Sequence, residues 1–343
     1  MGRLDIGLGL LTTQTPPGGD PAAVYEAVPA IGAAAERARF DAVWSSEHHV
    51  AEDGYLTAPL LALAAIAGVT STIRLCSGVV LAPLWPPLRL AEEAVTLQLM
   101  SKGRLTLGLG LGYRTAEYGV HGVPRSKRGR RLEETVEVVR RLWAGETVDL
   151  DDERGRVPGL AVSPHPSTPI PVWLGGYAEP AVRRAARIGD GFLAGGGEPE
   201  LVGRLLDQLD DEGPVHPGFQ IGVQQTIIPE DGPVDPEVLR QGLLHSEETY
   251  AQWRDEEGGG TTLRALSGEP DAGGTVAKIV DRLTPVLSRL RRYEHVQLVC
   301  RLIHPGLDEA QSVALVEDAG ERLLPALRAR WEKLPEGPSE SSR

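Results

Sequence analysis

Two histidines and a glutamate stand together where a strand is predicted to end. The apolar run from Asp41 to Ser46 is followed directly by Glu47, His48 and His49. Imidazole titrates near physiological pH, so a histidine here can serve as a general base, while a histidine that only caps the strand is the structural alternative. Successive residues of an extended chain point in opposite directions. We therefore expect His48 to face the interior as the catalytic residue and His49 to turn toward the wall.

The same triplet does not predict a metal site. Metal ligands on one helix face need a spacing such as i, i+4, and neighbouring histidines point apart. No metal ion is therefore expected at Glu47, His48 and His49.

Glycines follow two other apolar runs. Gly175-Gly176-Tyr177 comes after Pro171 to Leu174 and leads into a predicted helix at Glu179, and Gly195-Gly196 follows the run Gly191 to Ala194. Backbone N–H groups at the start of a helix bind anions, and glycine lets a ligand approach the backbone closely. These junctions are candidate phosphate sites; the structural alternative is a tight connection without a ligand.

A nicotinamide dinucleotide site is not predicted. Gly7-Leu8-Gly9-Leu10-Leu11-Thr12 lacks the third glycine of the usual fingerprint, and Gly108-Leu109-Gly110-Leu111-Gly112-Tyr113 has its last glycine one position early. The doubly wound open sheet that carries this fingerprint is therefore disfavoured.

Eight strand-like runs alternate with helical stretches along the chain. Such alternation is typical of parallel strands joined by crossover helices, and eight units favour a (β/α)8 TIM barrel with loop insertions. In this fold, catalytic groups stand at the carboxyl ends of the strands. The predicted strands are Leu4 to Leu10, Asp41 to Ser46, Ile73 to Val80, Arg104 to Leu109, Pro171 to Leu174, Gly191 to Ala194, Phe219 to Thr226 and His295 to Leu302.

The predicted helices lie between these strands and after the last one. They are Ala22 to Arg39, Ala58 to Ala67, Pro87 to Met100, Gly129 to Trp143, Glu179 to Ile188, Pro199 to Leu209, Thr275 to Arg292 and Asp308 to Trp331. Two segments fall outside the pattern: Asp149 to Pro169, and Glu247 to Gly274, which we expect to be a surface loop or an active-site lid. Residues 1–334 should form one domain, followed by a disordered tail over 335–343.

Composition limits the partners and the compartment. The 343 residues carry 48 acidic and 35 basic side chains, a formal charge of −13 that repels nucleic acid and anionic lipid. No apolar run reaches about 18 residues, so no membrane association is expected. Cys76 and Cys300 lie singly in apolar runs, and the start of the chain does not look like a secretion signal. We expect a cytoplasmic protein.

Several motifs together resemble the bacterial luciferase-like flavin-dependent monooxygenases. The resemblance covers most of residues 4–195, and the remainder is similar only in outline. The matching segments are Asp41 to His49, Ser101 to Gly110, Tyr113-Arg114, Glu117-Tyr118, Gly122-Val123-Pro124, Arg128-Gly129, Glu133-Glu134, Pro171 to Gly176 and Gly189 to Phe192.

The resemblance implies a flavin ring lying across the barrel mouth. In this family a non-prolyl cis peptide after the third strand supports the ring, which here implies Gly78-Val79; a strand bulge at Gly78 is the alternative. In this family, a residue near the end of the fourth strand provides a charged partner for the cofactor phosphate. This chain has Gly110 and Leu111 there, which carry no charge. Arg128 matches an arginine of relatives and could supply that charge, or could instead pair with Glu133 or Glu134.

The function expected from the resemblance is oxygenation of a small organic substrate with dioxygen and reduced FMN. The FMN would come from a separate, transiently bound flavin reductase, and a homo-oligomer is expected. A deazaflavin-dependent hydride transfer and a flavin-binding barrel without turnover are the alternatives. Trp44, Trp85 and Trp173 lie at or beside strand ends, where they could line a substrate pocket or belong to the core.

Overall fold

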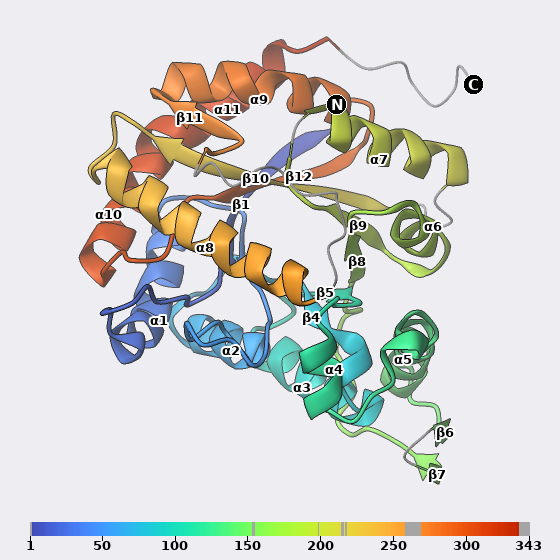
Figure 1. Cartoon of the computed structure of the whole chain (residues 1–343). Coiled ribbons are helices and arrows are strands. Elements are labelled where there is room, and N and C mark those ends of the chain that lie inside the picture. Colours follow the sequence, from blue (N-terminus) through green and yellow to red (C-terminus); the bar gives the residue numbers. More distant parts are fainter. Residues whose placement is uncertain are drawn as a thin grey trace.

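Eight parallel strands form a closed barrel (Figure 1). The computed structural model describes residues 2–152, 155–197, 199–213, 216, 218–257 and 269–335. The barrel closes because β10 pairs with β9 on one side and with β12 on the other. In order around the barrel, the strands are β1 (Arg3–Leu11), β2 (Ala42–Ser45), β3 (Arg74–Ser77), β5 (Leu105–Gly110), β8 (Val172–Gly176), β9 (Gly191–Ala194), β10 (Gln220–Pro229) and β12 (His295–Arg301).

Helices surround the barrel, and many of them begin at a proline. Proline suits the first turn of a helix because the backbone N–H that it lacks has no partner within the helix there. No helix in the described part of the chain is long and apolar enough to cross a bilayer. The helices between strands are α1 (Pro21–Arg37), α2 (Pro59–Val69), α3 (Pro87–Met100), α5 (Arg128–Trp143), α6 (Glu179–Ile188), α7 (Pro199–Glu212) and α9 (Val276–Leu290). The last strand is followed by α10 (Glu309–Asp318) and α11 (Leu324–Lys333), which a π-helical segment, Ala319–Leu323, joins.

The predicted TIM barrel is thus confirmed, and its strands lie where the sequence placed them. One predicted strand, Ile73 to Val80, is interrupted: β3 ends at Ser77, and the short β4 (Val80–Leu81) pairs with β5. The interruption is a cis peptide bond between Gly78 and Val79. A second non-prolyl cis bond joins Gly9 and Leu10.

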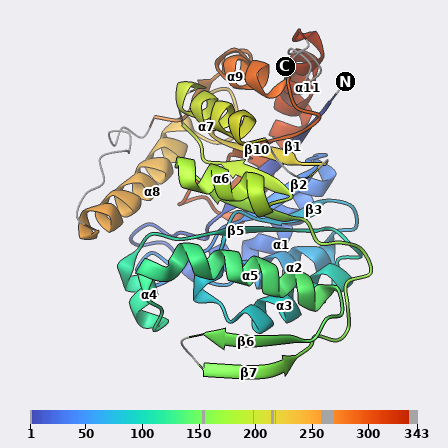
Figure 2. The same cartoon turned by 90° about the vertical axis from the view of Figure 1, so that its right-hand side faces the viewer.

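The prediction of a loop from Glu247 to Gly274 is wrong in its first part. Residues 236–256 form α8 (Pro236–Glu256), which lies at the same end of the barrel as the short helix α4 (Thr115–Val120) (Figures 1 and 2). Residues 269–274 return to the barrel, where β11 (Ala272–Gly274) pairs with β10. Residues 258–268, the centre of the predicted loop, lie outside the described residues.

The other predicted excursion lies away from the barrel. Asp149 to Pro169 contains an antiparallel hairpin of β6 (Val148–Asp152) and β7 (Gly155–Leu160) (Figure 2). The predicted disordered tail falls, apart from Pro335, on residues outside the described range.

Two tryptophans fill the interior of the barrel. Trp44 of β2 and Trp173 of β8 are fully buried, with ring centroids 5.5 Å apart and planes inclined at 53°. The Trp44 indole N–H donates to the side-chain oxygen of Gln297 on β12, 2.7 Å away. Burial of two large rings is a major contribution to core stability, so both residues belong to the core. Trp85 is partly buried instead.

Glycines on the facing strands make room for these rings. A Cβ at Gly7 would lie 2.8 Å from the Trp44 indole nitrogen, and a Cβ at Gly222 would lie 2.8 Å from the Trp173 ring. Real Cβ atoms do not approach so closely, so larger residues at these positions would displace a ring or a strand. The glycine-rich strands and the two tryptophans are therefore one packing arrangement.

We expect Gly108→Ala to destabilise the barrel by about 1 to 3 kcal/mol or more, because a Cβ there would lie 2.0 Å from the Ser77 carbonyl oxygen of the neighbouring strand. Chemical denaturation measures the loss. Gly68→Ala is the matched control: Gly68 is exposed in α2 with open space around it, so alanine should stabilise by about 0.5 to 1 kcal/mol. Equal stability of the two variants would contradict this description of the barrel interior.

Candidate active site

His48 stands at the carboxyl end of β2, at the mouth of the barrel. Its Nδ1 lies 2.8 Å from Oε1 of Glu117, a residue of α4 whose side chain is 0% exposed. Because a carboxylate only accepts hydrogen bonds, this pairing favours the tautomer with the proton on Nδ1, which leaves Nε2 as the free acceptor. No described residue is hydrogen-bonded to Nε2. The imidazole is therefore oriented as a base is in hydrolytic catalytic pairs.

Four aromatic rings surround this imidazole. Their centroids lie 4.8 to 5.8 Å from that of His48, and two of them come from α8: Tyr55, Tyr113, Tyr250 and Trp253. The Tyr55 and Tyr250 hydroxyl groups are 2.8 Å apart. Burial raises the pKa of Tyr55, Tyr113 and Tyr250, so these phenols stay protonated and can donate hydrogen bonds.

Glu47 connects the end of β2 to the chain beyond the cis peptide bond. Its side chain is fully buried, and it accepts hydrogen bonds from the Leu81 backbone N–H at 2.6 Å and the Trp85 indole N–H at 3.0 Å. His49 Nε2 lies 2.8 Å from the same carboxylate. The two neighbouring histidines thus diverge, as the sequence predicted: His48 toward Glu117 and His49 toward Glu47.

The protonation of His49 depends on these carboxylates. Burial opposes the charged imidazolium, but the hydrogen bond to Glu47 and the negative charges of Glu47 and Glu117 outweigh it and raise the His49 pKa. Arg114 limits the rise: its guanidinium, buried over the Trp253 ring at 3.9 Å, lies 3.9 Å from Glu117. Two buried carboxylates therefore share one nearby guanidinium and two imidazoles.

Val79, the second residue of the cis bond, is seated between two glycines. A Cβ at Gly110 would lie 2.4 Å from a Val79 methyl group, and a Cβ at Gly175 would lie 2.7 Å from the other. Beneath this segment, a Cβ at Gly78 would lie 2.7 Å from the Trp44 ring. The three glycines are thus needed to bring this segment close to Trp44 and to the neighbouring strands.

The predicted phosphate junctions lie on the next strands around the barrel. Gly175 and Gly176 end β8, and Tyr177 precedes α6 with its ring packed directly on Gly195. Gly196 lies against the β10 backbone and Asp271. These residues are therefore brought together, although the Tyr177 ring covers Gly195 in this structure.

Arg128, a predicted partner of the cofactor phosphate, is already bonded to a backbone carbonyl group. It begins α5 and donates to the Arg125 carbonyl oxygen at 3.2 Å. The predicted alternative pairing is not seen among the described residues, because Glu133 is held by Arg184 and Arg187, and Glu134 by Arg130. A guanidinium that the sequence did not suggest, Arg184, lines a small hollow beside Gly110 and Gly175.

Polar side chains fasten α8 over the mouth. Ser246 of α8 donates to Gln14, which follows β1, and Gln14 donates to Asp53, which follows β2. Thr249 also donates to Asp53, and Arg301 at the end of β12 donates weakly to Ser246 at 3.4 Å. α8 is therefore attached to three separate strand ends rather than to one.

Three polar atoms around His48 are buried without a hydrogen-bond partner among the described residues. They are Oε2 of Glu117, Nε of Arg114 and the hydroxyl group of Tyr113. Buried polar groups in proteins are nearly always hydrogen-bonded to protein or to ordered water, so these atoms mark where a polar partner is needed.

Comparison with known proteins places the chain in a family. The family model described as luciferase-like monooxygenase matches residues 4–272. An uncharacterised protein of Mycobacterium tuberculosis is 37% identical over 146 residues, which are 43% of this chain and 50% of that protein. The chain thus matches about half the length of that relative.

Two further relatives differ in the cofactor that their names state. An F420-dependent glucose-6-phosphate dehydrogenase of Nakamurella multipartita is 27% identical over 87% of this chain and 91% of its own. The oxygenase component of a flavin-dependent trigonelline monooxygenase of Acinetobacter baylyi is 33% identical over 41% of this chain and 40% of its own.

Solved structures share the fold with both cofactors. The oxygenating constituent of 3,6-diketocamphane monooxygenase from Pseudomonas putida, in complex with FMN, has a TM-score of 0.76 at 16% identity, over 98% of this chain and 100% of its own. An F420-dependent secondary alcohol dehydrogenase has a TM-score of 0.72 at 17% identity, over 95% and 99%. At these identities the similarity establishes the fold alone.

The raised His49 pKa predicts a pH-dependent contribution to stability. A group whose pKa is higher in the folded state stabilises fully below its unfolded value, near 6.5 for histidine, and loses that contribution as pH rises through the folded pKa. We expect the difference in unfolding free energy between wild type and His49→Gln to be largest below pH 6.5 and to shrink above it. Denaturant titrations from pH 5 to 9 measure it. A difference that grows with pH would contradict the assignment.

Proposed function

Because the chain belongs to the luciferase-like monooxygenase family, we propose that it is a flavin-dependent monooxygenase that uses reduced FMN and dioxygen to oxygenate a small organic substrate. The observation that carries the proposal is the His48–Glu117 pair beneath a roof of aromatic rings. It supplies an oriented base in surroundings from which side chains exclude water. Oxygenation benefits from such exclusion, since water that reaches a reactive intermediate promotes side reactions.

In this proposal the mouth holds the isoalloxazine ring on the floor formed by Gly78 and Val79, beside Gly110. The FMN phosphate is bound by backbone N–H groups of Gly175-Gly176-Tyr177, with Gly195-Gly196 and Arg128 as secondary partners. Arg184, which lines the hollow beside Gly110 and Gly175, is a further cation for that phosphate. When bound, the reduced flavin supplies the electrons that activate dioxygen.

His48 is the catalytic residue of this proposal. Its Nε2 accepts a proton from the reacting groups or returns one to them, and Glu117 acts as a positioning residue that fixes the tautomer and stabilises the imidazolium. The Tyr55–Tyr250 hydroxyl pair closes one side of the imidazole. These roles require no movement of β2. Glu47, which follows β2, is already hydrogen-bonded to Leu81 and Trp85 in the segment after β3.

Reduced FMN would come from a separate reductase that binds transiently. Two observations support this: the sequence lacks a nicotinamide fingerprint, and two similar proteins are described as the oxygenase component or oxygenating constituent of a monooxygenase.

A deazaflavin-dependent oxidoreductase is the second candidate. The relative named for that cofactor is similar over 87% of this chain, a larger share than the trigonelline monooxygenase relative covers. A hydride transfer also needs an oriented acid or base, which His48 could provide.

Anaerobic titration separates the FMN-dependent candidate from the F420-dependent one. The third candidate, a flavin-binding barrel without turnover, is tested by measuring turnover. We expect reduced FMN to bind more tightly than oxidised FMN and than F420, and Gly175→Ala to weaken reduced FMN about tenfold or more, because the new methyl group displaces Val79. Gly68→Ala should bind like wild type. Tighter binding of F420 than of reduced FMN would transfer the assignment to the second candidate.

Turnover tests the catalytic pair. His48→Gln should lower substrate-dependent dioxygen consumption by about 100-fold to 10,000-fold while FMN affinity is retained. His295→Gln is the control and should have no effect, because His295 is exposed at the start of β12, at the end of the barrel opposite the mouth. Glu117→Gln should lower it less, because the amide oxygen of glutamine can still accept the hydrogen bond from Nδ1. Near-wild-type turnover of His48→Gln would assign the base to another residue, and absence of turnover in the wild type would favour the third candidate.

A further inference from the structure

Arg301 points into the mouth of the barrel. Along β12, the Gln297 side chain is bonded to Trp44, and Val299 belongs to the apolar cluster around Trp44, so these alternate residues face the barrel interior. Arg301 is the next residue in this series and the last residue of β12. Its side chain therefore lies at the carboxyl end of the strands, the same end as His48.

The guanidinium of Arg301 is only partly satisfied. Among the described residues it forms no ion pair, and its one hydrogen bond is the weak donation from Nη2 to Ser246 at 3.4 Å. Nε is buried without a partner, whereas Nη1, which also lacks one, belongs to a half-buried side chain and is not sealed from solvent. A guanidinium stays charged, and an inward-facing charge is normally paired. Arg301 is thus a cation to which a dissolved anion has access.

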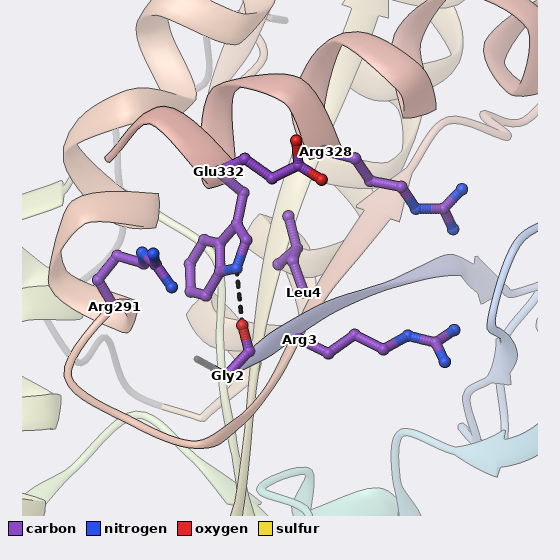
Figure 3. A pocket seen from close by; sticks show the side chains of 7 residues that line it. Gly2, Arg3, Leu4, Arg291, Arg328 and Glu332 are labelled. Atoms are coloured by element: carbon purple, nitrogen blue, oxygen red, sulfur yellow. Dashed lines mark hydrogen bonds between the residues drawn. The ribbon is translucent and has the colours of Figure 1, made fainter. Parts of the chain in front are cut away.

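The arginines at the opposite end of the barrel are neutralised or shielded. Arg3 and Arg328 are each paired with Asp41, and Figure 3 shows both pointing away from Arg291. Arg291 is 7% exposed, and its guanidinium carbon lies 4.7 Å from the centroid of the Trp331 ring. An anion is therefore less favoured at that end of the barrel than at the mouth.

An aromatic surface lies beside Arg301. Its partner Ser246 and Tyr250 are four residues apart on α8, which places them on one face of the helix with Cβ atoms about 5 to 6 Å apart. Burial raises the Tyr250 pKa, and the nearby charge of Arg301 opposes the rise. The Tyr250 hydroxyl lies 2.8 Å from that of Tyr55, and both rings border His48. A molecule held at Arg301 can thus lay a flat apolar body against rings that lead to the imidazole.

Arg301 lies across the mouth from the residues proposed to hold the flavin ring. Three strands separate β12 from β5 in either direction around the closed barrel, and β5 ends at Gly110 beside Val79. The predicted phosphate junctions follow β8 and β9, and β10 lies between β9 and β12. An anion at Arg301 is therefore on the opposite side of the mouth from the flavin ring.

We propose that the substrate carries a carboxylate, bound by Arg301, on a flat apolar body that packs against Tyr250 and Tyr55. The inference rests on the proposed function, because it names the substrate class of the same site. A carboxylate offers the two oxygens that a guanidinium fork binds, and one uncompensated cation neutralises a monoanion. Arg301 is then a specificity-determining residue, and His48 remains the residue at the reacting atoms.

Calorimetry on the full chain without flavin tests the proposal with benzoate and its uncharged isostere benzamide. We expect benzoate to bind about tenfold more tightly or better, and Arg301→Met to abolish this preference. Arg156→Met is the matched control, because Arg156 is exposed on the hairpin away from the barrel and its loss changes the net charge equally. No binding of benzoate by wild type, equal affinity for the two probes, or a preference that survives in Arg301→Met would overturn the proposal.

Anaerobic titration with reduced FMN separates a substrate carboxylate from the cofactor phosphate. Arg301→Met should bind reduced FMN as wild type does. A loss of about tenfold or more would place the FMN phosphate at Arg301 and overturn the proposal. Wild type that binds benzoate in preference to benzamide but does not bind reduced FMN would refute the proposed cofactor and leave the carboxylate site standing.

Arg301→Lys keeps the test decisive if Arg301→Met does not fold. Lysine retains the positive charge but lacks the planar fork, so the preference for benzoate over benzamide should fall severalfold. In that case, a preference unchanged from wild type would overturn the proposal.

Discussion

The packing of Trp44 and Trp173 against glycine backbone fixes the height of the floor on which the rest of the site is built. Trp44 is fully buried, bonded to Gln297, and in contact with Gly78 from below. Because the indole cannot be compressed, the chain after β3 must pass above it, and Val79 is then seated between Gly110 and Gly175. The tryptophans thus do not line a substrate pocket; they determine where a pocket can begin.

Buried charge is the second constraint. Glu47 and Glu117 are both completely buried, and the described groups that face them at the mouth are Arg114 and the two imidazoles. Burying two carboxylates is unfavourable unless each is fully hydrogen-bonded or paired. Glu47 meets this condition with three donors, whereas one oxygen of Glu117 has no partner among the described residues. The carboxylate that holds the segment after β3 is therefore fully hydrogen-bonded, and the carboxylate beside His48 is hydrogen-bonded only in part.

The sequence predicted the barrel well because its information is local. Alternating runs and helix starts identified every strand of the barrel, and the residues that follow β2 led to the prediction of His48 as a catalytic residue. It did not predict α8, although Leu239, Leu243, Ser246 and Trp253 follow a helical spacing, because the glycines at 258–260 suggested a loop. Nor did it predict the pairing of Glu117 with His48. These residues are 69 positions apart, and their meeting depends on how the segment after β5 folds over the mouth.

The attachment of α8 suggests how one barrel serves two kinds of cofactor. The floor is made by strands, whose positions are fixed by the interior tryptophans, and the roof is made by Tyr250 and Trp253 of a helix inserted after β10. A change in the roof alters the space above the ring without disturbing its support, since α8 is held by side-chain hydrogen bonds to Gln14, Asp53 and Arg301 rather than by a strand ladder. Relatives named for flavin and for F420 share the barrel at similar TM-scores. Under the proposed function, substrate choice in this chain should reside in α8 and in the strand ends and loops that it contacts.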